Sequence, residues 1–336
     1  MAPVALFHRL TSFYSRSPEP AAPALPEAAA ALLSVLFTVI YVAPFYASKA
    51  TRPSPTFHRD TPTAIRSRIR AVTLSCIVST LVTLYAIVQY GHVSVVETLS
   101  LLGWWPLSLP EVLRTLLLLV ILFSGPLFEH LVVDGGWRDA LTLRPAYYEL
   151  SSWIGWRNLV AGPITEELVW RSLLIPLHLL AALTPAKVIF TTPLYFGIAH
   201  IHHFYEFRLT HPDTPALPAL LRSLFQFTYT SFFGFFASFV FLRTGSVWAV
   251  IAAHSFCNTM GLPRVWGRLG VEAGVPSGSR DVGTGKKDDE GTSPAQDGRA
   301  GIGWTIAYYC LFFGGAYGFY KMLWPLTEST HALVDI

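Results

Sequence analysis

Charged residues are scarce in this chain, and their scarcity excludes an ordinary soluble domain. Only 13% of the 336 residues are Asp, Glu, Lys or Arg, whereas 52% are hydrophobic, and the mean hydropathy is +0.44. Soluble domains contain about 25% charged residues. The net charge of +3 is small and spread over several loops, so no nucleic-acid partner is indicated. The composition predicts a polytopic membrane protein in contact with lipid.

Cysteine and several well-known catalytic motifs are also missing or rare. The three cysteines, Cys76, Cys257 and Cys310, are odd in number and each lies in an apolar run, which excludes a disulfide framework. The sequence contains neither the HExxH of zincins nor the GxSxG of a nucleophile elbow. It also lacks the internal repeat that is typical of many transporters.

Apolar runs long enough to cross a bilayer recur along the chain. They predict an all-α polytopic membrane protein with about eight transmembrane helices around a membrane-embedded catalytic cavity. Pro126 is expected to bend the third of these helices. The predicted spans are roughly 28–48, 71–90, 112–133, 159–183, 186–204, 220–242, 246–262 and 304–326.

The same pattern divides the chain into five segments. Residues 1–27 are proline-rich and are predicted to be disordered, and residues 28–263 hold the first seven spans. The loop 264–303 contains a Gly/Ser/Asp/Lys-rich stretch, Gly274 to Gly301, that we interpret as a disordered insert. The last transmembrane helix, 304–326, precedes a short tail, 327–336.

The distribution of basic residues predicts the orientation. The loop 49–70 holds six basic residues against one acid, Asp60, and the positive-inside bias therefore places it in the cytosol. With eight spans, both termini lie on the lumenal side. The loops after the third, fifth and seventh spans then also face the cytosol.

The fourth predicted span carries two glutamates and an arginine in an otherwise apolar run. A charged group at membrane depth costs about 2.5–3.5 kcal/mol on insertion scales, so these residues require a reason. Glu167 and Arg171 are four positions apart and can form an ion pair that locks helix packing. Glu166 points about 100° away from Glu167 and has no obvious partner on its own helix. We therefore expect Glu166 to face a buried polar cavity and to act there chemically.

Two further spans bring histidines to a similar predicted depth. His254 and Asn258 are four positions apart in the seventh span, and Phe196 and His200 have the same spacing in the fifth. A glutamate and a histidine together can bind and deprotonate a water molecule, and a second histidine with an asparagine can donate to an oxyanion. The set of Glu166, His200, His254 and Asn258 thus suits amide hydrolysis by directly activated water.

Other interpretations remain open at the level of the residues. Glu166, His200 and His254 could instead be three zinc ligands, or the polar residues could line a transport path or fix packing in a non-catalytic scaffold. In a third interpretation the thiol of Cys257 is the nucleophile, although apolar buried cysteines are common. His202 and His203 are interpreted as interfacial side chains.

The three spaced motifs and their flanking text resemble the type II CAAX prenyl endopeptidases, the Ras-converting proteases of the endoplasmic reticulum. The matching stretches are EExxxR, FxxxH and HxxxN, within WRNLVAGPITEELVWRSLL, PLYFGIAHIHHFYE and SVWAVIAAHSFCN, preceded by RDTPTAIRSRIRAV. The likeness runs from about the first to the seventh span. The insert near Gly274 to Gly301 departs from the pattern but lies away from the motifs.

The resemblance implies an eight-helix intramembrane hydrolase that removes the last three residues from farnesylated or geranylgeranylated CAAX proteins. It implies that Glu166 and His200 activate the water, and that His254 and Asn258 form the oxyanion site. Supporting roles fall to three further residues: Glu167, Arg171 and Phe196. We expect neither a cofactor nor a bound metal, and a location in the endoplasmic reticulum membrane with the active site open towards the cytosol.

Overall fold

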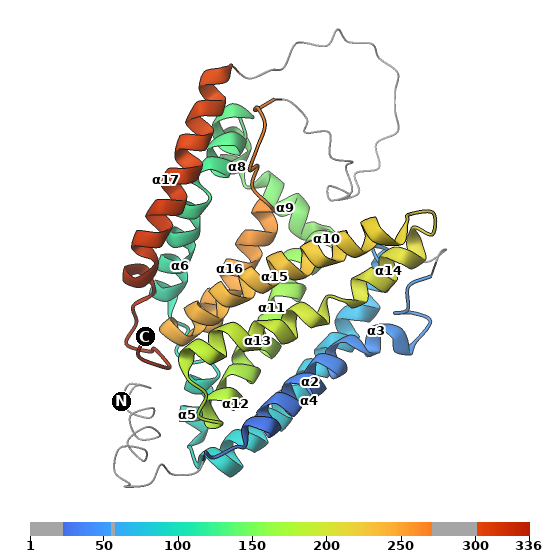
Figure 1. Cartoon of the computed structure of the whole chain (residues 1–336), viewed down its shortest axis with the longest axis vertical. Coiled ribbons are helices and arrows are strands. Elements are labelled where there is room, and N and C mark those ends of the chain that lie inside the picture. Colours follow the sequence, from blue (N-terminus) through green and yellow to red (C-terminus); the bar gives the residue numbers. More distant parts are fainter. Residues whose placement is uncertain (1–22, 55–57, 271–300) are drawn as a thin grey trace.

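The computed structural model describes residues 23–54, 58–270 and 301–336, and these residues form helices and no β-strand, which confirms the all-α prediction (Figure 1). The segment 1–22 and almost all of the predicted insert, Gly274 to Gly301, lie outside the described residues. The helices are α2 (Glu27–Val42), α3 (Pro44–Ala47), α4 (Pro62–Gly91), α5 (Val95–Leu101), α6 (Leu109–Leu122), α7 (Ser124–Phe128), η1 (Glu129–Val133), α8 (Trp137–Thr142), α9 (Arg144–Ser151), α10 (Trp153–Trp156), η2 (Arg157–Ala161), α11 (Gly162–Glu167), η3 (Leu168–Leu173), α12 (Leu174–Leu180), α13 (Pro185–Ala199), α14 (His202–Thr210), α15 (Ala216–Thr244), α16 (Val247–Met260) and α17 (Ile302–Thr327), where η marks a π-helical segment.

Three helical stretches of the described chain are long and apolar enough to cross a membrane: Glu27–Ala47, Pro62–Gly91 and Ala216–Thr244. A fourth candidate is the pair α6 and α7–η1, which is bent by 77°. Pro126 lies in the first turn of α7 and has no N–H to donate to the carbonyl of Leu122, so the helix cannot continue regularly there. The expected bend in this span is confirmed.

The other predicted spans do not combine length with apolar composition, so the count of eight stays a prediction. Helices α13 and α16 have 15 and 14 residues, which corresponds to about 21–23 Å, less than the ~30 Å hydrocarbon core. Helix α17 is long but rich in tyrosine, tryptophan and glycine. The fourth predicted span is a succession of α- and π-helical segments around its charged residues.

The fifth predicted span ends earlier than expected, because α13 stops at Ala199 and α14 begins at His202. The Nδ1 atom of His200 lies 2.8 Å from the carbonyl oxygen of Phe196, the acceptor that a continuing α-helix would give to the backbone N–H of His200. That N–H bonds to Gly197 instead. The side chain therefore competes with the helix and places His200 at its end.

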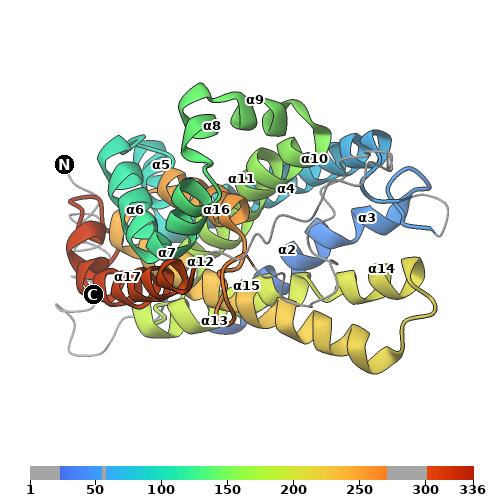
Figure 2. The same cartoon turned by 90° about the horizontal axis from the view of Figure 1, so that it is seen from above.

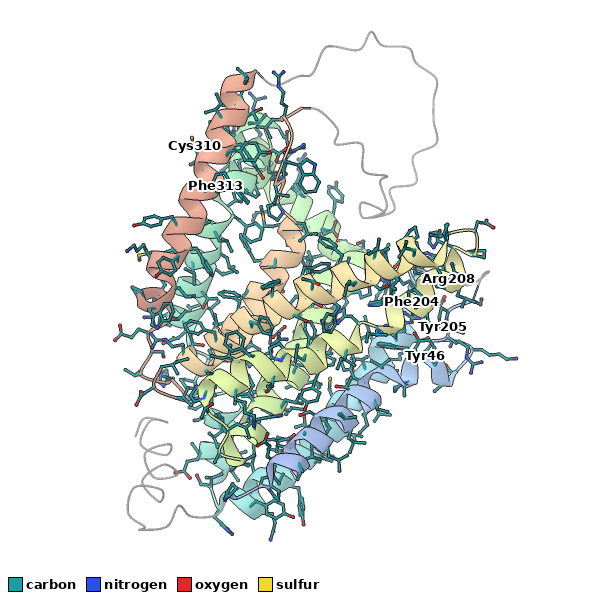
Figure 3. All side chains as sticks on the ribbon, in the orientation of Figure 1. Tyr46, Phe204, Tyr205, Arg208, Cys310 and Phe313 are labelled. Carbon is teal, nitrogen blue, oxygen red and sulfur yellow. The ribbon has the colours of Figure 1, made fainter. Side chains whose placement is uncertain are left out.

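One end of the molecule gathers the basic loops that the charge pattern assigned to one side. The guanidinium of Arg59 lies 3.6 Å from the Glu206 carboxylate, and Arg157 lies 2.5 Å from Asp60. Figure 1 shows α3 and α14 together at this end, and Figure 3 shows the labelled side chains of Tyr46 and Tyr205 there, with ring centroids 5.8 Å apart. The loops after the first, third and fifth predicted spans thus share one side.

The opposite end gathers the turns after the second, fourth and sixth predicted spans. The N–H of Leu25 donates to the carbonyl of Leu180, and that of Val247 donates to the carbonyl of Gly103. The C-terminal tail also returns here, where Leu333 bonds to the carbonyl of Leu242. Helices α6 and α17 pack side by side along one flank (Figure 2). The helix axes therefore run between two distinct ends, as in a membrane protein with loops on two sides.

Helices α13 and α15 approach closely at two glycines, and this contact positions the charged residues of the site. A Cβ atom on Gly234 would lie 2.5 Å from Cβ of Pro193 and 3.1 Å from Nη2 of Arg171. A Cβ atom on Gly197 would likewise lie 2.7 Å from Oγ of Ser231 and 2.8 Å from a ring carbon of Phe227. Small residues at such crossings allow helix backbones to come together.

Gly234→Ala should therefore destabilise the protein by about 1–3 kcal/mol, because the added methyl group overpacks the crossing. The shift of the Arg171 neighbourhood should also lower activity. Thermal unfolding in detergent micelles measures the first effect. Gly314→Ala in α17 is the matched control, since a Cβ atom there meets nothing within 4 Å. Equal melting temperatures for the two variants would contradict a close contact between α13 and α15 at Gly234.

Candidate active site

The two glutamates lie on α11, a short α-helix between the π-helical segments η2 and η3. Pro163 has no N–H, so the carbonyl of Leu159 lacks its α-helical donor. In η2 the N–H of Gly162 bonds to Arg157 rather than to Asn158. The wider turns thus leave backbone carbonyls open to a neighbouring helix. π-helical turns of this kind are frequent at functional sites.

Helix α16 satisfies these open carbonyls with its own side chains. Ser255 Oγ donates to the carbonyl of Leu159 at 2.8 Å, and Asn258 Nδ2 donates to the carbonyl of Asn158 at 2.8 Å. These two bonds hold α16 against η2, the segment directly before the helix α11 that carries Glu166. One N–H of the Asn258 amide is therefore committed to structure, which the sequence did not indicate.

Glu167 is the centre of a fully buried ion group. Its carboxylate lies 3.2 Å from Nη1 of Arg171, which confirms the predicted i, i+4 pair, and 2.7 Å from Nδ1 of His254. The Arg171 guanidinium also stacks on the rings of Phe196 and Phe233, at 4.6 and 5.6 Å from their centroids. Because Glu167 and Arg171 are both 0% exposed, each charge depends on the other.

Glu166 faces a pocket, as expected from its position about 100° from Glu167. The pocket has a cavity volume of ≈ 240 Å³. Its wall includes Glu166, His200 and Asn258, so three of the four predicted catalytic residues line it. The fourth, His254, lies beside it with Nε2 3.9 Å from a Glu166 oxygen. The structure thus brings together residues from α11, α13 and α16.

The hydrogen bonds place a proton on Nδ1 of both histidines. A carboxylate can only accept, so Nδ1 of His254 carries the proton that is donated to Glu167. The backbone carbonyl of Phe196 likewise takes the Nδ1 proton of His200. In both rings Nε2 is therefore the atom left for chemistry. The ring of Phe196 lies between them, with centroids 4.6 Å from His200 and 6.4 Å from His254.

A second part of the pocket wall is apolar and comes mostly from α2, α3 and α4, with one residue each from η3 and α13. The hydroxyl of Tyr41 is hydrogen-bonded to Thr165 at 2.9 Å, one residue before Glu166. The apolar lining residues are Val42, Phe45, Ile65, Ile69, Val72, Trp170 and Ala199. One cavity thus joins a carboxylate and an imidazole to an extended hydrophobic surface.

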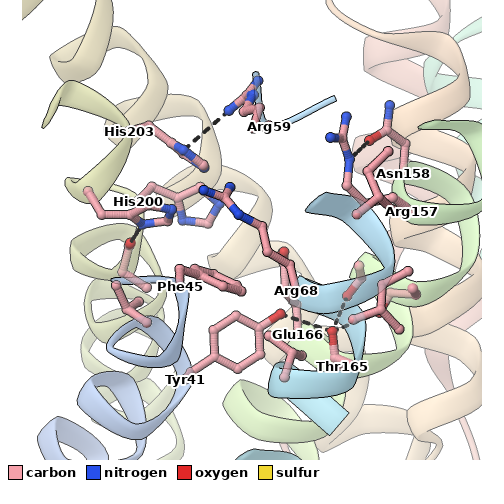
Figure 4. A pocket seen from close by; sticks show the side chains of 18 of the residues that line it. Tyr41, Phe45, Arg59, Arg68, Arg157, Asn158, Thr165, Glu166, His200 and His203 are labelled. Atoms are coloured by element: carbon pink, nitrogen blue, oxygen red, sulfur yellow. Dashed lines mark hydrogen bonds between the residues drawn. The ribbon is translucent and has the colours of Figure 1, made fainter. Parts of the chain in front are cut away.

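A network of charges that sequence reasoning missed surrounds the other part of the pocket. Arg157 and Arg59 both contact Oδ1 of Asp60, at 2.5 and 3.8 Å. Arg59 and Arg68 both contact Glu206, at 3.6 and 2.6 Å. Figure 4 shows Arg59 and Arg157 towards one end of the pocket and Tyr41 and Thr165 towards the other. The basic density of loop 49–70 was a signal, but it predicted only orientation.

The charge state of this network is well defined at Glu206. Burial raises the pKa of Glu206. The hydrogen bond with His203 and the charge of Arg68 lower the pKa by more than burial raises it, so the net pKa lies below its usual range. His202 and His203 also line the pocket. Their interfacial position stays a prediction, and the break after Ala199 places both residues at the start of α14.

The metal and thiol interpretations find little geometric support in the described part of the chain. The group whose potential ligand atoms lie within 4.8 Å of one another is His202, His203 and Glu206, not Glu166, His200 and His254. Glu206 already contacts two arginines, which oppose a cation. Cys257 is absent from the pocket lining to which its neighbour Asn258 contributes.

A carboxylate and imidazole groups at a cavity inside an apolar helical protein suit a hydrolase that acts within a membrane. Comparison with known proteins gives the family. The family described as Type II CAAX prenyl endopeptidase Rce1-like matches residues 148–260, which include all seven predicted site residues.

Full-length relatives extend this match. The "Probable CAAX prenyl protease 2" of Schizosaccharomyces pombe is 37% identical over 240 residues, covering 71% of this chain and 83% of the relative. The human CAAX prenyl protease 2 is 35% identical over 236 residues, covering 68% and 69%. That of Saccharomyces cerevisiae is 29% identical over 254 residues, covering 69% and 79%. No solved structure matches significantly.

The chain therefore belongs to the type II CAAX prenyl endopeptidase family. It is a membrane protease, which confirms the predicted class of enzyme and sets aside the scaffold and transporter interpretations.

Proposed function

We propose that this protein removes the C-terminal tripeptide from isoprenylated CAAX proteins, such as Ras-type GTPases, and that Glu166 activates the attacking water. The observation that supports this most directly is the pocket itself, where the Glu166 carboxylate and His200 share one cavity with a hydrophobic wall. The first part of the proposal follows the names of the relatives. The second follows the geometry.

The proposed reaction needs a base, an acid and an oxyanion site. Glu166 takes a proton from a water that also bonds to Nε2 of His200, and the water oxygen attacks the carbonyl carbon of the prenylated cysteine. The tetrahedral intermediate collapses, the C–N bond breaks, and the proton on Glu166 passes to the leaving amine. The products are a new carboxylate on the cysteine and a free tripeptide.

His254 is proposed to stabilise the oxyanion as an imidazolium. Two carboxylates, Glu166 and Glu167, lie 3.9 and 2.7 Å from its ring nitrogens, and only one of them is balanced by Arg171. A protonated His254 makes the group of four charges neutral, and its Nε2 proton points towards the Glu166 side. The second N–H of Asn258 is the other proposed donor.

The hydrophobic wall between α2 and α4 is proposed to hold the farnesyl or geranylgeranyl chain. Val42, Phe45, Ile69 and Val72 line this side, and an isoprenoid contributes only apolar surface, so burial there is favourable. The same arrangement suits a location in the endoplasmic reticulum membrane with the basic end facing the cytosol, where short basic loops are normally retained.

Cleavage of a farnesylated CAAX peptide by the purified protein tests the proposal against its thiol and zinc alternatives. Cys257→Ala should retain most of the wild-type rate, and a strong chelator should not abolish cleavage, because neither a thiol nor a metal takes part in the proposed reaction. A dead Cys257→Ala enzyme that is folded would make the thiol the nucleophile. Loss of activity on chelation, restored by zinc, would make His200 and His254 ligands.

A further inference from the structure

The charged wall of the pocket has a composition that a catalytic site alone does not explain. Three arginines line the cavity, Arg59, Arg68 and Arg157, whereas the carboxylates that pair with them, Asp60 and Glu206, are not part of the lining. The lining side chains in this part of the pocket are therefore basic. A basic wall indicates an anionic group on the molecule that the pocket binds.

The contacts form an alternating chain with one positive charge left over. Arg157, Asp60, Arg59, Glu206 and Arg68 follow one another through contacts of 2.5, 3.8, 3.6 and 2.6 Å. Three guanidinium groups thus share two carboxylates among these residues. A single additional carboxylate would balance the chain.

Arg157 and Arg59 are better placed than Arg68 to accept that carboxylate. Arg68 is 12% exposed and donates from Nη2 to Glu206 and from Nε to the carbonyl of Thr51, so it is the least accessible of the three arginines. Arg157 and Arg59 are 27% and 39% exposed and meet at the same oxygen of Asp60. Two guanidinium groups around one point can bind a carboxylate in a fork geometry that lysine cannot provide.

The helix that carries Glu166 provides a length scale. Arg157 lies nine positions before Glu166 in a continuous run of α- and π-helical segments, which corresponds to about 13 Å at the rise of an α-helix. An extended chain spans about 3.3–3.6 Å per residue, so three residues beyond a scissile bond reach about 10–11 Å. In a regular α-helix nine positions would put the two side chains on opposite faces, at about 100° per residue. The π-helical turn of η2 alters that rotation, and both residues line one pocket.

We propose that Arg157 and Arg59 bind the free α-carboxylate at the C-terminus of the substrate and so fix the cleavage position three residues before it. This inference rests on the proposed function. When the arginines hold the terminal carboxylate, the peptide bond three residues before it lies beside Glu166. A peptide whose terminal charge is removed should therefore bind poorly even when its prenyl group and sequence are unchanged.

The test compares two farnesylated peptides of identical sequence, one ending in a free acid and one in a carboxamide. Wild-type protein should cleave the acid with a kcat/KM about tenfold to a hundredfold higher, mainly through KM, as a charge-assisted hydrogen bond predicts. Arg157→Gln should remove most of this preference, because it should slow cleavage of the acid much more than cleavage of the carboxamide. Arg66→Gln is the matched control, because Arg66 lies near the start of α4 with its guanidinium over the ring of Trp153, and it does not line the pocket.

The outcomes separate the inference from the function on which it rests. If wild-type protein cleaves neither peptide, the proposed function fails. If it cleaves both equally, or if Arg157→Gln keeps the preference for the acid, the function stands and the carboxylate site is overturned. The more exposed Arg59 provides a second variant that should fold readily. Arg59→Gln should also lower the preference, and an unchanged ratio would overturn the role of the pair.

Discussion

Glu166→Gln is expected to leave a folded protein that binds prenylated peptide normally and hardly cleaves it. Glutamine keeps the shape of the side chain but cannot accept a proton from water. The expected loss in kcat is at least ~10²–10⁴, the usual contribution of one general base, and KM should change little. His200 can still hold the water through Nε2, but it lacks the carboxylate that carries the proton to the leaving amine.

The measurement is a steady-state cleavage assay with a parallel binding measurement in the same detergent. Glu328→Gln, which removes an exposed carboxylate at the end of α17, is the control and should match wild type. A Glu166→Gln enzyme with a rate near that of wild type would remove Glu166 as the base and return the role to Glu167 or to a metal.

Glu167→Leu should produce the second large effect, and that effect should fall on stability first. The substitution leaves the Arg171 charge fully buried with no carboxylate beside it, which typically costs about 3–5 kcal/mol. Among the described residues, Nε and Nη2 of Arg171 already have no hydrogen-bond partner, so little remains to compensate for the loss. The single variant should unfold at a much lower temperature or fail to accumulate.

A double variant separates stability from chemistry. Glu167→Leu with Arg171→Met replaces the buried pair by apolar side chains of similar size and should recover much of the thermal stability, because the uncompensated charge is gone. It should still be a poor enzyme, since Nδ1 of His254 loses the acceptor that lies at 2.7 Å and the imidazolium loses its stabilising charge. A double variant with full activity would show that Glu167 serves packing only.

The sequence predicted contacts within one helix better than contacts between helices. The pairing of Glu167 with Arg171 and the separate direction of Glu166 both follow from about 100° per residue, and the structure shows both. The bond between His254 and Glu167 joins residues 87 positions apart, and no local spacing predicts it. The similar depth predicted for these residues in the membrane indicated that the histidines lie near the glutamates. It did not indicate which atoms are bonded.

The fold was predictable as a class and less so in its details. Apolar runs indicated an all-helical membrane protein, but they do not show where side chains interrupt a helix. His200 ends α13 because its ring takes a backbone acceptor. Pro163 and the π-helical turn of η2 leave two carbonyls open, and Ser255 and Asn258 donate to them. Both events depend on side-chain geometry that hydropathy does not record. The sequence likewise showed the arginines around Asp60 only as basic residues of separate loops, and their contacts with Asp60 appear only in the folded structure.

Single-turnover cleavage of a farnesylated CAAX peptide in the presence of hydroxylamine tests direct attack by water, the central claim of this account. Mass spectrometry of the products should show an intact tripeptide and a peptide that ends in the carboxylate of its prenylated cysteine, with no hydroxamate. Those products are expected because, in the proposed reaction, Glu166 activates water and no enzyme side chain holds the acyl group. A hydroxamate that grows with hydroxylamine concentration would reveal an acyl-enzyme and contradict the account.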